Sequence, residues 1–203
     1  MAEKKSLFLL GRYTRATGTL FVLSGPSGCG KTTLCGKLLK KRLGLVRSVS
    51  VTTRNRRGKE IENKDYIYIS IPEFKRQLAK GMLLEHAEVF GHYYATPRGF
   101  VEQSLHSRRN VIMNIDIQGA AQIKQKFKQA VLIFILPPTL DALETRLRNR
   151  SSDTLAQIRT RLAIARRELA AIKTYDYVVI NDRVDKAVGQ IASIITATQH
   201  RIR

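Results

Sequence analysis

Cysteine is scarce in this chain, which has only Cys29 and Cys35 among its 203 residues, and tryptophan is absent. The two cysteines lie six residues apart, and no cluster of histidine and cysteine has the spacing of a zinc site. These shortages argue against a scaffold held by disulfides and against a zinc module. We expect two free thiols in a reducing compartment and therefore a cytoplasmic protein.

Long apolar runs are also missing. The main one, residues 131–136, is far shorter than the roughly 18 residues that a membrane-spanning helix needs, and residues 7–10 are too few for the core of a signal peptide. No internal repeat, low-complexity tract or flexible Gly/Ser linker divides the chain. We expect a soluble protein with a leader at residues 1–17 and one domain at residues 18–203.

Acidic residues are few as well, because 16 Asp and Glu stand against 36 Lys and Arg, a formal net charge of +20. The excess is spread along the chain: residues 1–100 carry 19 basic and 7 acidic residues, and residues 101–203 carry 17 and 9. This surplus indicates an anionic partner. Composition alone leaves open a nucleic acid, a membrane surface or a phosphate compound.

Predicted strands and helices alternate along the chain. Strand-like segments occupy residues 19–24, 45–53, 66–71, 83–90, 111–115, 131–136 and 177–181. Helical patterns occupy residues 31–43, 72–81, 118–128 and 184–198, and two more helices are expected after the capping residues Thr139 and Thr154. This alternation predicts an α/β fold whose parallel sheet is flanked by helices on both faces.

Residues 25–32, GPSGCGKT, match the phosphate-loop pattern G-x-x-x-x-G-K-[ST] at every fixed position, between a predicted strand and a predicted helix. Backbone N–H groups and the helix dipole can surround phosphate oxygens there. Lys31 is expected to reach the β- and γ-phosphates. Thr32 is expected to offer its hydroxyl to Mg²⁺, and Asp116, which follows an apolar strand, either anchors that ion or only caps the next helix. The residues expected to bind a nucleoside triphosphate are Gly25, Pro26, Ser27, Gly28, Cys29, Gly30, Lys31, Thr32 and Thr33.

Seven further motifs follow in order: SVSVTTR at 48–54, RRGKE at 56–60, KDY at 64–66, LEHA at 84–87, GHYYATP at 91–97, IDIQG at 115–119 and VIND at 179–182. In order and spacing they resemble the guanylate kinase family, from about residue 19 to the C-terminal helix. The resemblance implies phosphorylation of GMP by ATP on a fold of the P-loop nucleoside triphosphate hydrolase type. It implies a core of residues 18–49, 102–145 and 161–203, a GMP-binding insertion at 50–101 and a short lid at 146–160.

The resemblance also implies how GMP is held. The residues implied to hold its phosphate are Arg54, Arg57, Tyr66 and Tyr94, and those implied to face its guanine are Ser50, Glu85 and Thr96. The chemistry agrees, because guanidinium groups bind phosphate through paired hydrogen bonds and phenols add neutral donors. One carboxylate can accept both N1–H and N2–H of guanine. Adenine offers no such pair, so Glu85 is expected to discriminate between the two bases by about 10⁴-fold or more.

The remaining implied residues complete the set. Asn114 stands where the family usually has Asp, and we expect this change to weaken GMP binding modestly. Three arginines align with cations of the family's lid region and would surround the transferring phosphoryl group: Arg146, Arg150 and Arg161. With Lys31 and Arg54 they form the expected catalytic set, and no general base is needed because the attacking phosphate is already ionised. Asn181 resembles an adenine contact, with a helix-capping turn as the alternative.

Three other functions compete with this one. A guanylate kinase-like scaffold domain typically has a degraded phosphate loop, whereas this one is complete, and a nucleic-acid-binding protein would carry a recognisable motif that is missing here. A kinase for another nucleoside monophosphate is the nearest rival. The expected partners are ATP and GMP, with dGMP as a second acceptor, and we expect no dedicated nucleic-acid partner and no membrane. The sequence leaves the oligomeric state open.

Overall fold

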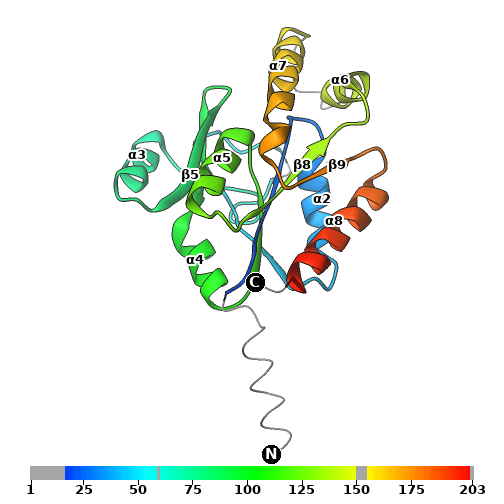
Figure 1. Ribbon diagram of the computed structural model, residues 1–203. Helices are drawn as coiled ribbons and strands as arrows, with labels where there is room; N and C mark the ends of the chain where they lie inside the picture. Colours follow the sequence, from blue (N-terminus) through cyan, green and yellow to red (C-terminus); the bar gives the residue numbers. More distant parts are fainter. Residues whose placement is uncertain (1–16, 59, 150–154, 202–203) are drawn as a thin grey trace, which may run out of the picture.

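The structure, a computed structural model, describes residues 17–58, 60–149 and 155–201. Within them a five-stranded sheet in the order β2-β7-β1-β8-β9 forms the centre of the molecule, and every neighbouring pair is parallel (Figure 1). Its strands are β1 (Leu20–Ser24), β2 (Leu45–Arg47), β7 (Asn110–Asn114), β8 (Val131–Leu136) and β9 (Tyr177–Ile180). All five residues of β1 are buried, as expected for a strand covered on both faces. The predicted α/β architecture is therefore confirmed.

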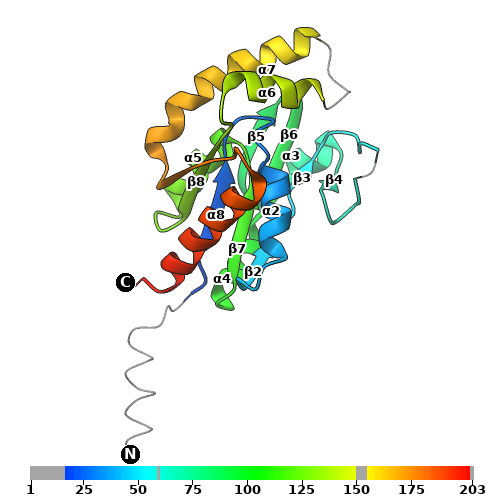
Figure 2. The same ribbon diagram turned by 90° about the vertical axis from the view of Figure 1, so that its right-hand side faces the viewer.

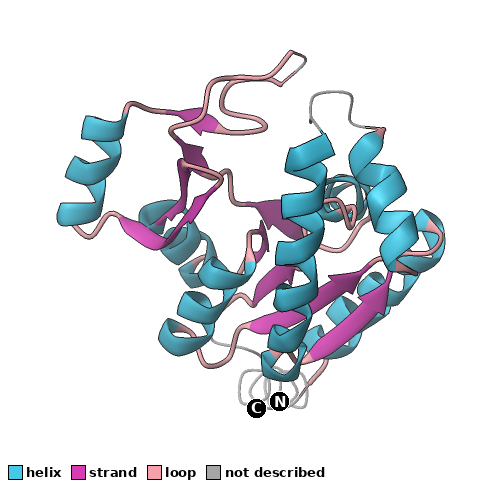
Figure 3. Ribbon diagram, turned by 90° about the horizontal axis from the view of Figure 1, so that it is seen from above, coloured by secondary structure: helices cyan, strands magenta, loops and turns pink. Residues whose placement is uncertain are grey.

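Helices cover both faces of this sheet (Figure 3). On one face α2 (Lys31–Leu39) and α8 (Val184–Gln199) pack against the strands, and the predicted inward residues of α8, Val188, Ile191 and Ile195, are buried. On the other face lie α4 (Arg98–His106) and α5 (Ile117–Lys126), through residues such as Val101 and Ile123. Because β1 and β7 are parallel neighbours, their carboxyl ends lie side by side at one edge of this three-layered core.

The strands between β2 and α4 form a second sheet. Its order is β4-β3-β6-β5 (Figure 2), with β3 (Val51–Thr52), β4 (Ile67–Tyr68), β5 (Leu83–Val89) and β6 (His92–Pro97). Strands β5 and β6 form an antiparallel hairpin, and α3 (Ile71–Ala79) buries Phe74 against Val51, Leu83 and Ala95. This sheet has a small core of its own, and Leu84 of β5 is also buried in the core of the larger sheet, so the two sheets are packed together.

The last part of the fold is a pair of helices, α6 (Leu140–Arg148) and α7 (Leu155–Glu168), followed by the 3₁₀ segment η1 (Leu169–Thr174). Leu143 and Leu147 pack against Ile158 and Ala165. Thr139 caps α6, because its side chain accepts a hydrogen bond from the Ala142 N–H, as predicted. The predicted cap at Thr154 lies outside the described residues. No helix in the described part of the chain is long and apolar enough to cross a membrane.

Several predicted boundaries were wrong. The first helix ends at Leu39 rather than near residue 43. The polar residues that follow turn the chain, and the backbone N–H of Lys41 donates to the Leu38 carbonyl oxygen. The strand predicted at 45–53 is split, since its two ends pair in different sheets. The strand predicted at 66–71 is only Ile67–Tyr68, and Ser70 caps the helix that starts directly after it.

Two elements were not predicted, β6 and α4. Pro97 and Gly99 are residues typical of turns, so the sequence does not indicate that α4 begins between them. The signal that was present is the apolar pair Val101 and Leu105, four residues apart, which is buried against the central sheet.

Candidate active site

The phosphate-loop motif forms the turn between β1 and α2. Gly25 and Gly30 both have positive φ values, 136° and 96°, which favour glycine. A Cβ on Gly25 would lie 2.4 Å from the Ile135 carbonyl oxygen, so no other residue fits there. Lys31 Nζ donates to the Gly25 and Pro26 carbonyl oxygens at 2.6 and 2.9 Å. The ammonium group of Lys31 therefore lies against the phosphate loop, where it is expected to contact the bound phosphates.

The end of β9 braces this loop. Asn181 is buried, and its Nδ2 donates to the Cys29 carbonyl oxygen at 2.8 Å. Arg146 Nη2 donates in turn to the backbone oxygen of Asn181 at 2.8 Å. Gly30 leaves the necessary room, because a Cβ there would lie 2.4 Å from Asn181 Nδ2. Asn181 and Arg146 thus contact the protein's own backbone. Arg183, not Asn181, occupies the N-cap position of α8, and its side chain makes no capping hydrogen bond.

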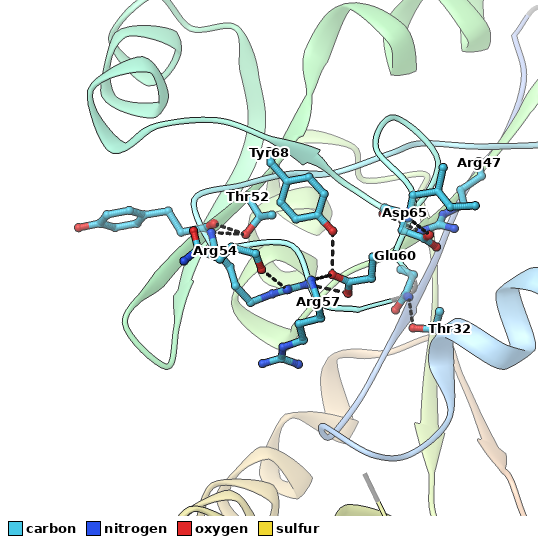
Figure 4. Close-up of polar contacts among 12 residues, drawn as sticks. Thr32, Arg47, Thr52, Arg54, Arg57, Glu60, Asp65 and Tyr68 are labelled. Carbon is cyan, nitrogen blue, oxygen red and sulfur yellow. Dashed lines mark hydrogen bonds and ion pairs between the residues drawn. The ribbon is translucent and has the colours of Figure 1, made fainter. Parts of the chain in front are cut away.

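The second sheet supplies a cluster of cations and phenols. The buried Arg54 donates to Glu60 Oε1 at 2.8 Å, and its guanidinium carbon lies 5.3 Å from the Tyr66 ring centre. Glu60 also accepts from the Arg57 backbone N–H at 2.8 Å and from the Tyr68 hydroxyl at 2.7 Å (Figure 4). Burial raises the pKa of Glu60, but these hydrogen bonds outweigh it and lower the pKa to about 2. Glu60 is therefore a permanent anion that fixes Arg54.

Glu85 on β5 is buried, and its Oε1 accepts a hydrogen bond from Thr96 Oγ1 at 2.6 Å. Burial is the main reason that the pKa of Glu85 is raised to about 7, and the nearby Asp116 adds to the rise. The carboxylate lies against the first turn of α5, where a Cβ on Gly119 would come within 2.2 Å of Glu85 Oε2. Glycine at position 119 is thus what leaves space for this group.

Polar side chains also gather at the carboxyl end of β7. Asn114 Nδ2 donates to the Thr32 hydroxyl oxygen at 3.1 Å. Asp116 caps α5, because its Oδ1 accepts from the Gly119 N–H at 2.7 Å. Burial raises the pKa of Asp116, and the positive charge of Lys31 partly opposes this. The capping role considered in the sequence is therefore present. No group of three or more His, Cys, Asp and Glu that could hold a metal ion occurs within the described residues.

A cavity of about 860 Å³ joins these parts. The predicted residues that line it come from the phosphate loop and α2, from the two sheets and the loops beside them, and from α7. They are Gly25, Ser27, Gly28, Gly30, Lys31, Thr32, Thr33, Ser50, Arg54, Arg57, Tyr66, Glu85, Tyr94, Asn114, Asp116 and Arg161. Pro26, Cys29, Thr96, Arg146 and Asn181 are not among the lining residues. Arg150 lies outside the described residues. One cavity therefore connects the phosphate loop with the buried carboxylate of Glu85.

Comparison with known proteins identifies the family. The family model for guanylate kinase matches residues 17–198. The chain belongs to the guanylate kinase family. It is 44% identical to the guanylate kinase of Caldanaerobacter subterraneus subsp. tengcongensis over 185 residues, which are 91% of this chain and 90% of that protein. It is 46% identical to that of Wolbachia pipientis wMel over 182 residues, 89% and 90% of the two chains.

A solved structure agrees with this assignment to the guanylate kinase family. The crystal structure of guanylate kinase from Anaplasma phagocytophilum superposes with a TM-score of 0.78 at 34% identity, and the match covers 93% of this chain and 89% of that one. The resemblance inferred from the motifs is thereby confirmed.

Sequence reasoning missed several residues that line the cavity of this guanylate kinase family member, among them Glu60, Phe90 and Glu168. Glu60 lies within the motif RRGKE, but the motif alone does not indicate its role. Glu168 follows two arginines in α7, and an acidic residue in such a basic helix was the available signal. Burial raises the pKa of Glu168, and the charge of Lys31 opposes the shift. Nothing in the sequence around Phe90 indicated its position.

Proposed function

We propose that this chain transfers the γ-phosphoryl group of ATP to GMP, giving ADP and GDP. A phosphate oxygen of GMP attacks the γ-phosphorus, and the bond from that phosphorus to the bridging oxygen of ADP breaks. The observation that supports the proposal is that one cavity has the phosphate loop at one side and the buried carboxylate of Glu85 at the other.

The donor side would use Lys31 and the loop N–H groups to hold the β- and γ-phosphates. Arg161 lies close to the loop, since its Nη1 donates to Ser27 Oγ at 3.1 Å, and we propose that it stabilises the charge that spreads over the transferring group. Arg146 and Arg150 are proposed for the same task. Phosphoryl transfer needs positioned cations more than it needs proton transfer, which fits a site without a general base.

Magnesium fits the donor side. The Thr32 hydroxyl and the Asp116 carboxylate are hard oxygen ligands of the kind Mg²⁺ prefers, and Mg²⁺ is usually held by one or two protein groups together with substrate phosphates. We propose that these two residues hold it. When bound, the ion would supply positive charge to the phosphate oxygens. Asn181 is proposed to act on the ATP side by keeping the Cys29 segment of the loop in place.

The acceptor side would hold GMP from two directions. Arg54, Arg57, Tyr66 and Tyr94 are proposed to bind its phosphate. Ser50, Glu85, Thr96 and Asn114 are proposed to bind the nucleoside. Glu60 supports this set, because its ion pair with Arg54 holds the guanidinium group in place. Glu85 would accept both guanine donors in its ionised form, and a buried carboxylate left unpaired by adenine would penalise AMP.

The proposed division of the chain follows these roles. Residues 50–101 would form the acceptor region and residues 146–160 the lid, with the phosphate loop in the remaining core. The reaction belongs to purine nucleotide metabolism, and dGMP is the proposed second acceptor. A cytoplasmic location stays a prediction, and the oligomeric state is left open.

The experiment that tests the proposal is a coupled assay of ADP formation from ATP and GMP. Lys31→Ala is expected to lower kcat by about 10²-fold or more, because it removes a preorganised cation from the phosphates. Lys37→Ala is the matched control, since Lys37 lies in the same helix, forms an exposed ion pair with Asp185 and is not among the residues that line the cavity. Unchanged turnover in Lys31→Ala would contradict the proposal.

A further inference from the structure

Phe90 occupies an unusual position at the tip of the β5–β6 hairpin. The strands pair as far as Val89 and His92, which leaves Phe90 and Gly91 as a two-residue turn. Both residues have positive φ values, 51° and 75°, the sign that a type I′ turn requires. Asn, Asp and Gly are favoured at the first position of such a turn, and a bulky residue is disfavoured. Phe90 is also 43% exposed, so neither turn preference nor burial explains an aromatic residue here.

The ring of Phe90 contacts an arginine from another part of the chain. The guanidinium carbon of Arg161 lies 4.5 Å from the Phe90 ring centre, a cation–π contact. Arg161 belongs to α7, and its Nη1 reaches Ser27 of the phosphate loop. Both Phe90 and Arg161 line the cavity. Figures 1 and 2 show the β5–β6 hairpin and α7 at the same end of the molecule.

We propose that Phe90 is a positioning residue for the transfer reaction, which holds the Arg161 guanidinium group beside the phosphate loop. The inference rests on the proposed function, because it is that function which gives Arg161 its task at the transferring phosphoryl group. Phe90 itself touches no reacting atom in this account. It acts only through Arg161.

An aromatic ring suits this task better than a carboxylate does. A ring that faces the guanidinium plane restricts its orientation and leaves its in-plane N–H donors available for phosphate oxygens. A carboxylate would use one or more of those donors and offset the charge, as Glu60 does when it accepts from Arg54 Nη2. Phe90 also links the two halves of the cavity, because its hairpin carries Glu85 on β5 and Thr96 on β6.

The test compares substitutions that separate the ring from the turn. Phe90→Asn supplies the residue that the turn prefers but no ring, so its melting temperature is expected to equal or exceed that of the unmodified chain. Its kcat is expected to fall by about two- to thirty-fold, the range of a cation–π contact, with little change in KM for GMP. Phe90→Leu, which keeps an apolar side chain, is expected to lose kcat similarly. Phe90→Tyr restores an aromatic face and is expected to recover most of the lost kcat.

Phe100→Leu is the matched control, because Phe100 is exposed to the same degree, 42%, but lies on α4 and is not a lining residue of the cavity. Its kcat is expected to stay unchanged. A double-mutant cycle identifies the partner: in an Arg161→Met background, Phe90→Asn is expected to cause no further loss. Full kcat in Phe90→Asn, or losses that multiply in the double variant, would overturn the inference while leaving the proposed function intact. An unmodified chain that does not phosphorylate GMP would overturn both.

Discussion

Thr96 and Glu85 face each other across the β5–β6 hairpin, and the Thr96 hydroxyl donates to Glu85 Oε1 at 2.6 Å. Both side chains are buried. The strand register places Glu85 Oε1 beside the Thr96 hydroxyl, and Glu85 Oε2 lies in the space that Gly119 leaves by having no side chain. The group proposed to recognise guanine is therefore held rigidly before any nucleotide binds, which is the condition for strong discrimination.

GMP affinity is expected to depend on the ionisation of Glu85. Burial raises the pKa of Glu85 to about 7, and only the ionised carboxylate can accept both guanine N–H groups. The dissociation constant for GMP should therefore rise as the pH falls below about 7, by up to about tenfold per pH unit. Isothermal titration calorimetry between about pH 5.5 and 8.5 measures this.

The phosphate of GMP titrates as well, with a pKa of about 6, so the titration is repeated with Glu85→Gln. This variant is expected to bind GMP weakly and to keep only the pH dependence of the phosphate. Identical pH profiles for the two proteins would show that Glu85 does not titrate in the binding range.

The same carboxylate is expected to cost stability. Its pKa in the folded chain, about 7, lies above the ordinary value of 4.5, so the folded state is favoured while Glu85 is protonated and loses that advantage as the pH rises through 7. Glu85→Gln should raise the free energy of unfolding at pH 8 by up to about 3 kcal/mol. Urea unfolding measures the difference, which should shrink as the pH is lowered toward 4.5. A variant less stable than the unmodified chain at pH 8 would contradict this.

Gly119→Ala should damage the acceptor side alone. The added Cβ would lie 2.2 Å from Glu85 Oε2 and would displace the carboxylate. KM for GMP is expected to rise by about tenfold or more, since a misplaced buried acceptor loses its hydrogen bonds, while KM for ATP stays the same. Steady-state kinetics in both substrates measure this. Gly189→Ala is the control, because a Cβ there meets nothing within 4 Å, and it should leave both KM values unchanged.

Asn114→Asp tests the departure from the family. Asn114 donates to the Thr32 hydroxyl oxygen at 3.1 Å, and a carboxylate cannot make that donation but can accept from a nucleoside hydroxyl. We expect kcat/KM for GMP to rise by about two- to tenfold, the value of one improved hydrogen bond. Asn114→Ala serves as the comparison and should show no gain. If kcat/KM does not rise in Asn114→Asp, the asparagine does not weaken GMP binding.

The sequence predicted best what depends on local chemistry. The phosphate loop was located because its glycines, Lys31 and Thr32 lie within eight consecutive residues between a strand and a helix. The inward face of α8 followed from the spacing of its apolar residues. The local pattern failed where strand pairing determines the structure. Residues 45–53 resemble one strand, but Val46 pairs with Val111 in one sheet and Val51 pairs with Ala95 in the other.

Contacts between distant segments were beyond sequence reasoning. The sequence does not indicate that the Asn181 amide donates to the Cys29 carbonyl oxygen of the phosphate loop. That contact forms only when β9 has joined the central sheet. The pairing of Phe90 with Arg161 is of the same kind. Such contacts follow from the strand order of the folded chain, and a single sequence carries no periodic signal for them.

Acceptor choice tests the central claim most directly. ADP formation is measured with ATP and each of GMP, AMP, UMP and CMP, for the unmodified chain and for Glu85→Gln. We predict that kcat/KM for GMP exceeds that for AMP by about 10⁴-fold or more and that Glu85→Gln loses most of this ratio. Equal kcat/KM values for GMP and AMP in the unmodified chain would contradict the account.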